Sequence, residues 1–180
     1  MKAKITITEA LQEVKTIDAR IQKKKEFIFN FLFRQNNQRD PHEKDGGSAS
    51  LIAKERQSIN DLLERKISIR NSINVANAEN SITIKDQSRT ISEWLVWKRD
   101  VAPTLKAVLN ETAARLQSMR QDVSRKGLTV TQNAPAEVTL DVIVNVNEAE
   151  LAKQIENLEE TLSTLDGQFS LKNATIKIDV

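Results

Sequence analysis

The chain has 180 residues, of which 39% are hydrophobic and 29% charged, and it contains no cysteine. The lack of cysteine excludes disulfides, thiolate metal sites and a cysteine nucleophile, and a net charge of +2 is too small to favour nucleic acid as a partner. No stretch approaches the ~18 apolar residues of a membrane-spanning helix, and residues 1–9 lack the apolar core of a signal peptide, so we expect synthesis in the cytoplasm.

The N-terminal half of the chain predicts two long helices joined by a polar loop. Thr6 and Glu9 have the spacing of a capping box, which predicts a helix over residues 8–33. Its apolar positions repeat every seven residues: Ile7, Val14, Ile21 and Ile28. A polar loop over residues 35–50 leads to a second predicted helix over residues 50–77, and the lengths favour an antiparallel hairpin. The second helix has its apolar positions at Ile52, Ile59, Leu62, Leu63, Ile67, Ile69, Ile73 and Ala76.

A short strand and a third long helix are predicted next. The alternating residues 81–85 are typical of a strand. Thr90 and Glu93 form a second capping-box pattern, which begins a helix predicted over residues 91–126. The apolar positions of this helix are Ile91, Leu95, Ala102, Leu105, Leu109, Leu116, Met119 and Val123.

Pro103 lies inside the third predicted helix. Proline lacks a backbone N–H and crowds the carbonyl four residues earlier, here that of Arg99. We therefore expect a kink or a break near Arg99. Gly127 is placed to end the helix.

The C-terminal part changes from helical to strand periodicity and back. Alternating apolar residues surround an expected turn at 133–136: Leu128, Val130, Val138, Leu140, Val142, Val144 and Val146. Asn147 and Glu150 then have N-cap spacing for a helix over residues 148–172. Its apolar residues step by four and three: Leu151, Ile155, Leu158, Leu162, Leu165 and Phe169. The last residues, 174–180, alternate again, and we expect this strand to pair in parallel with the earlier one.

These elements predict a mostly α, α+β fold. We expect long antiparallel helices, as a coiled-coil-like hairpin or bundle, with one small β-sheet. Residues 1–126 would form the helical region with its short strand near 81–85, and residues 127–180 a strand–helix–strand unit packed on it as one cooperative domain.

Residues that could perform chemistry are few. The single histidine, His42, lies in the polar loop, where such a side chain is usually solvated, and it has no second histidine with which to form a zinc site. Gly46 and Gly47 are not followed by the residues of a phosphate-binding loop. Glu159 and Glu160 lie on the solvent face of their helix, which offers no enclosed site for acid–base catalysis. We predict no catalytic, cofactor-binding or metal-binding residues.

The segment 27–33 holds four of the five phenylalanines, at Phe27, Phe29, Phe31 and Phe33. On a helix these side chains surround most of the circumference, so one neighbouring helix cannot cover them all. Three interpretations stay open: burial in the chain or at a subunit interface, a docking tip for another protein, or insertion into a membrane surface next to Lys23, Lys24 and Lys25. All four phenylalanines are candidate interface residues.

Trp94 and Trp97 are the second aromatic feature. They are three residues apart and therefore share one helix face. Anchoring the core is one interpretation, and a protein interface next to Lys98 and Arg99 is the other. We treat both tryptophans as candidate interface residues.

Three segments resemble a family of uncharacterised, mostly helical proteins that is labelled septicolysin-like. They are SIRNSINVAN at 68–77, RTISEWLVWKRD at 89–100 and VNVNEAELAKQIENLEETLSTLDG at 144–167. The order of helix, strand, turn and final amphipathic helix is similar. The resemblance implies a helical oligomer of unknown function. Small helical proteins of this kind also resemble structural accessories of bacteriophage particles.

The sequence therefore predicts a structural protein that is not an enzyme, that assembles with itself or binds another structural protein, and that belongs to a bacteriophage or prophage particle. Its location would then be the virion after synthesis in the cytoplasm. The alternative is a membrane-surface-binding or membrane-active protein that uses segment 23–33. We expect no cofactor.

Overall fold

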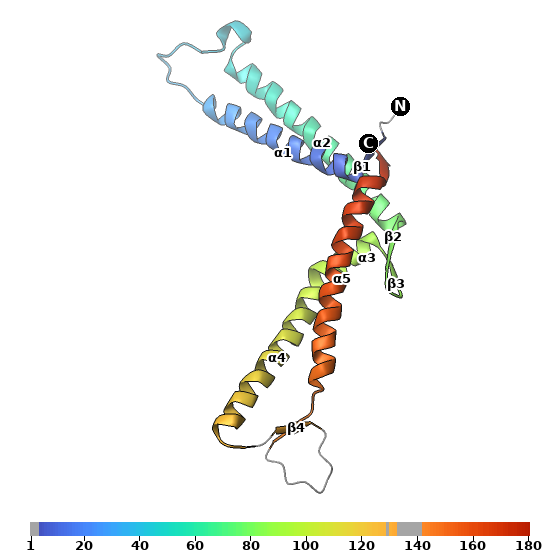
Figure 1. Ribbon diagram of the computed structural model, residues 1–180. Helices are drawn as coiled ribbons and strands as arrows, with labels where there is room; N and C mark the ends of the chain where they lie inside the picture. Colours follow the sequence, from blue (N-terminus) through green and yellow to red (C-terminus); the bar gives the residue numbers. More distant parts are fainter. Residues whose placement is uncertain (1–3, 129, 133–141) are drawn as a thin grey trace. The chain divides into compact units, whose positions relative to one another are not determined.

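The computed structural model describes residues 4–128, 130–132 and 142–180. It divides into two compact units, one of residues 1–80 with 170–180 and one of residues 81–169 (Figure 1). We had expected one cooperative domain in which residues 127–180 form a unit packed on residues 1–126. In the structure the C-terminal strand pairs with the N-terminal one, whereas the third long helix packs against the last helix.

The first unit is a helical hairpin closed by a pair of strands. Its elements, in chain order, are β1 (Lys4–Thr6), α1 (Ile7–Asn30), the short 3-10 helix η1 (Glu43–Asp45), α2 (Ser48–Glu79) and β6 (Lys177–Asp179). The capping box that begins α1 is confirmed, since the Thr6 side chain accepts a hydrogen bond from the backbone of Glu9 and the Glu9 carboxylate accepts one from the backbone of Thr6.

Ion pairs show that α1 and α2 run antiparallel. Lys24, late in α1, bonds Glu55, early in α2, over 2.6 Å. Glu13, early in α1, instead pairs with Arg65, further along α2, over 2.9 Å. The predicted helical hairpin is therefore present, and the two helices lie side by side in Figure 1.

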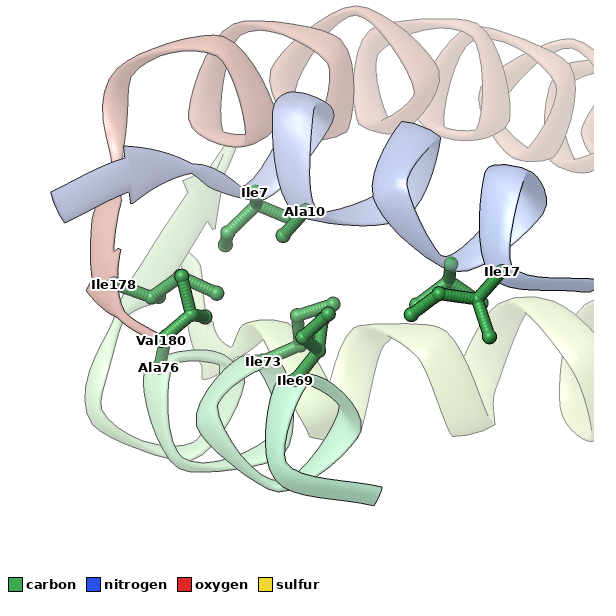
Figure 2. Close-up of a cluster of buried hydrophobic side chains, with 9 residues drawn as sticks. Ile7, Ala10, Ile17, Ile69, Ile73, Ala76, Ile178 and Val180 are labelled. Carbon is green, nitrogen blue, oxygen red and sulfur yellow. The ribbon is translucent and has the colours of Figure 1, made fainter. Parts of the chain in front are cut away.

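The core of the first unit lies where the strands meet the two helices. Figure 2 shows the side chains that fill it, and they come from α1, α2 and the C-terminal strand. The buried members are Ile7, Ala10, Val14, Ile17, Ile69, Ile73, Ala76, Ile178 and Val180. Two residues that we predicted to face inward, Leu63 and Ile67, are exposed, because they lie on a different face of α2 from the buried Ile69 and Ile73.

The C-terminal strand corrects one prediction. β6 pairs antiparallel with β1, with Ile5 opposite Ile178, and not in parallel with the strand before the last helix. Pairing with β1 places Ile178 and Val180 in the core of the first unit, and this burial favours the observed partner over the crossover that we expected.

The second unit combines a β-hairpin with two long helices. Its elements are β2 (Ser81–Ile84), β3 (Gln87–Thr90), α3 (Ile91–Val96), the π-helical turn η2 (Trp97–Val101), α4 (Ala102–Arg125), β4 (Val130–Gln132), β5 (Val142–Val144) and α5 (Glu148–Thr175), of which the last residues belong to the first unit. The Thr90–Glu93 capping box and the Asn147 cap of α5 are both confirmed.

The predicted irregularity near Arg99 is a single π-helical turn. Trp97–Val101 follows π-type hydrogen bonding between α3 and α4. Pro103 cannot donate to the carbonyl of Arg99, so the regular ladder is interrupted at this point. Gly127 ends α4 as expected, with a φ of +69°.

α4 and α5 pack antiparallel along the predicted apolar seam. Leu151, Leu158 and Leu165 are buried, and Leu109 of α4 belongs to the same cluster as the first two. Lys106 bonds Glu159 over 3.0 Å. Further along α4, Arg120 bonds Glu148 at the start of α5, so the two helices run in opposite directions.

The fold class is therefore the predicted one, mostly α with small strand pairs. The single small sheet that we predicted is wrong, because the strands of the described residues form three separate pairs. β1–β6 and β2–β3 are antiparallel, and β4–β5 is parallel. The expected turn at 133–136 and the strand positions Val138 and Leu140 lie outside the described residues.

Candidate interaction surfaces

The four phenylalanines of segment 27–33 separate into two pairs. Phe27 and Phe31 contact one another, with ring centroids 4.9 Å apart. Phe29 and Phe33 have 59% and 86% of their surface exposed. The pairs separate because residues four apart share a helix face, and this spacing holds up to the end of α1.

His42 packs against the inward pair. Its ring lies 5.5 Å from that of Phe27 and 4.5 Å from that of Phe31. The side chain is 23% exposed, and its Nδ1 is 3.9 Å from a carboxylate oxygen of Asp45. The expectation of a solvated histidine is therefore wrong, because the loop folds back and the His42 ring packs on the two phenylalanine rings.

Asp40 fixes the loop to the start of α2. Its carboxylate accepts hydrogen bonds from the backbone N–H of Ser48 and of His42, each over 2.9 Å, and from the Ser48 hydroxyl over 2.6 Å. These bonds lower the pKa of the Asp40 carboxyl from 3.8 to about 2. Gly47 precedes the first helical residue and has no side chain to cap it, so Asp40 caps the helix from a distance.

The outward pair forms an apolar end to the hairpin. We call Phe29, Leu32 and Phe33 the hairpin tip; Leu32 is 59% exposed. A hollow of about 440 Å³ lies beside it, lined in part by Leu32, Phe33 and Ile52. Among the four phenylalanines, the tip pair is the one whose rings are available for contact with another molecule.

The two tryptophans differ in exposure. Trp94 is 1% exposed, and its indole Nε1 donates a hydrogen bond to the carbonyl of Ile82. Trp97 is half-buried and meets the Trp94 ring edge-on at 5.3 Å. The structure thus places Trp94 in the core, where it holds the β-hairpin to α3.

A groove of about 690 Å³ opens beside Trp97. Its walls include Arg89 of the β-hairpin, Leu105 of α4 and Leu158 of α5. The guanidinium of Arg89 lies 5.1 Å from the centroid of the Trp94 ring. Lys85, also in the wall, is paired with Glu160 of α5 over 2.8 Å, so that cation is already neutralised.

A second apolar surface, missed by the sequence reasoning, runs from the last residue of η2 along the first turns of α4. Val101, Leu105 and Val108 are 47%, 41% and 56% exposed, and we call them the α4 outer stripe. Their spacing of four and then three residues is the signal that could have revealed them. We had predicted Leu105 and Leu95 to face inward, but both are exposed. Leu105 lies outside the face of α4 that packs against α5.

The shifted carboxyl groups are explained by capping and pairing. Hydrogen bonds from Thr6 and from Thr90 lower the pKa of Glu9 and of Glu93, and a hydrogen bond from Arg99 lowers that of Asp100. Across the described ranges, no group of three or more histidine or acidic side chains is arranged to hold a metal ion. In the same part of the chain, no helix combines the length and the apolar character needed to cross a membrane.

Comparison of the chain with protein-family models, with curated proteins and with solved structures gives no match.

Proposed function

We propose that the protein is a structural, non-enzymatic protein that assembles with copies of itself through the α4 outer stripe. The observation that carries the proposal is the exposure of Val101, the last residue of η2, with Leu105 and Val108 of α4, in helical spacing. Exposed apolar residues scattered singly are ordinary, but a stripe with this spacing is the surface that a second helix covers.

The charges next to the stripe support a second copy as the partner. Arg99 pairs with Asp100 and Arg115 with Glu111, each over 2.8 Å. Lys98 and Lys106 pair with acidic residues of α5, so these charges near the stripe are balanced. In a two-fold interface a surface meets its own copy, and an excess of one sign would repel. A balanced surface avoids this repulsion.

The oligomeric state of the purified protein tests the proposal. Val101→Ser with Val108→Ser removes apolar surface from the stripe, and we expect the pair to lower the mass found by light scattering while the helical circular dichroism is kept. Asn110→Glu changes an exposed residue on another face of α4 and should leave the mass unchanged. A native chain that is strictly monomeric at micromolar concentration would contradict the proposal.

A bacteriophage or prophage particle is the setting that we propose for this assembly, since such particles are built from many copies of small proteins. The resemblance to septicolysin-like proteins implies a helical oligomer as well and stays a prediction. Immunoblotting of purified particles from a lysogenic host provides the test, and absence of the chain from them would exclude the setting without excluding self-assembly.

A further inference from the structure

The apolar residues of the hairpin tip are grouped at the end of a helix, whereas those of the α4 outer stripe follow one another along a helix face. Its three apolar residues lie in the last turn of α1 and directly after it, and Phe33 is 86% exposed. The exposed positions of α1 from Gln12 up to Phe29 contain one apolar residue, Ala19. On α1, therefore, a partner helix would find apolar surface at the end of the hairpin and, apart from Ala19, none between Gln12 and Phe29.

The surroundings of the tip are basic. Between Arg20 and Arg56 the chain has nine lysines and arginines against five acidic residues, a net charge of +4, whereas the whole chain carries +2. Lys25 lies over the Phe29 ring, 5.5 Å from its centroid. Lys23, Lys25 and Arg34 form no salt bridge with any residue that the structure describes.

We propose that the hairpin tip binds the surface of an anionic lipid membrane. Phe29, Leu32 and Phe33 would enter the boundary between headgroups and acyl chains, which accepts a small apolar end and needs no matching stripe. Lys23, Lys25 and Arg34 would meet the anionic headgroups, because a negatively charged leaflet attracts clustered basic residues. A second copy is disfavoured as the occupant, since it would bring the same positive charge to the contact.

The proposal is independent of assembly through α4, so each can fail alone. In a flotation experiment at low ionic strength, we expect the native chain to bind vesicles of phosphatidylcholine with 30% phosphatidylserine, and to bind pure phosphatidylcholine at least tenfold more weakly. High salt should reduce the binding, because the Debye length falls to roughly 3 Å at 1 M.

Two sets of variants separate the apolar and the charged contributions. Phe29→Ser with Phe33→Ser, and separately Lys23→Glu with Lys25→Glu, should each weaken binding to the anionic vesicles at least tenfold. All four side chains are exposed, so both variants should retain the native circular dichroism; Phe33→Ser alone is the milder substitute if the first pair unfolds.

The matched control changes exposed apolar residues elsewhere in the same unit. Leu63→Ser with Val75→Ser removes side chains that are 42% and 55% exposed on α2, and it should leave vesicle binding unchanged. Absence of flotation with anionic vesicles overturns the proposal. So does binding that survives both tip variants, and so does capture by soluble polyglutamate as tight as capture by the vesicles, which would indicate an acidic protein as the partner.

Discussion

The indole Nε1 of Trp94 donates a hydrogen bond of 2.9 Å to the backbone carbonyl of Ile82. Both side chains are almost completely buried, so the bond links β2 to α3 away from water. Neither the capping box of α3 nor the alternation of the strand encodes this contact, yet it fixes how the β-hairpin lies against the helix.

Trp94→Phe removes this donor and leaves the carbonyl of Ile82 without that partner. A buried hydrogen bond contributes about 0.5–1.5 kcal/mol, so we expect a loss of that order in the free energy of unfolding, measured by urea titration. Trp97→Phe is the control, because Trp97 is only half-buried, and it should cost less. Equal losses for the two variants would show that ring volume, and not the hydrogen bond, is what matters.

Leu158→Ala should destabilise the second unit strongly. Leu158 is 6% exposed and packs in the cluster shared by α4 and α5, where a large-to-small change costs about 2–5 kcal/mol. Glu159→Ala, one position along, removes an ion pair with Lys106 in which both side chains are about half exposed, and such pairs contribute ~0–1 kcal/mol. Equal urea midpoints would mean that the seam is not the packed face.

The features that local patterns predict are those whose causes lie within a few residues. Thr6 with Glu9 and Thr90 with Glu93 begin helices as expected, because a capping box joins residues three apart. The seam of α5 is likewise a local periodicity. The π-helical turn before Pro103 follows from a single missing N–H.

The features that were missed depend on residues far apart in the sequence. β1 is three residues long, and its pairing with β6 joins Ile5 to Ile178. No periodicity in either segment identifies that partner. His42 was expected in solvent because nothing near it in the sequence indicates the Phe27 and Phe31 rings that it covers.

The exposure of the candidate interface residues also depends on parts of the chain that are distant in the sequence. The sequence does not show which of the four phenylalanines are covered and which are exposed. The structure separates them because α1 ends at Asn30 and the following loop folds back over one face. The α4 outer stripe could have been read from spacing, but which of two apolar faces meets α5 is decided by packing across the unit.

Lys85 adopts a left-handed backbone conformation, with a φ of +52°, at the turn of the β-hairpin. This region costs a residue with a side chain about 1–2 kcal/mol and costs glycine little. Lys85→Gly and Lys85→Val both lose the ion pair with Glu160, so the loss of that pair does not contribute to the difference between them. We expect the valine variant to have the lower melting temperature and a free energy of unfolding that is lower by about 1–2 kcal/mol. Equal melting temperatures would mean that the turn rearranges freely.

Asp40 should make the stability of the first unit depend on pH. Its carboxyl pKa is lowered from 3.8 to about 2 by hydrogen bonds from Ser48 and His42. A carboxyl group whose pKa is lower in the folded state stabilises that state at pH values above its unfolded-state pKa. The contribution disappears as the pH falls through the folded-state pKa.

Asp40→Asn retains one acceptor oxygen but replaces the other with an amide nitrogen, which cannot accept the bond from the Ser48 backbone. We therefore expect the native chain to melt at a higher temperature than Asp40→Asn at pH 7, and the difference to shrink steadily as the pH falls from 4 to 2. Asp45→Asn removes a carboxylate from the same loop without touching Ser48 and serves as the control. A difference between native and Asp40→Asn that stays constant from pH 7 to pH 2 would show that the remote cap does not depend on the charge of Asp40.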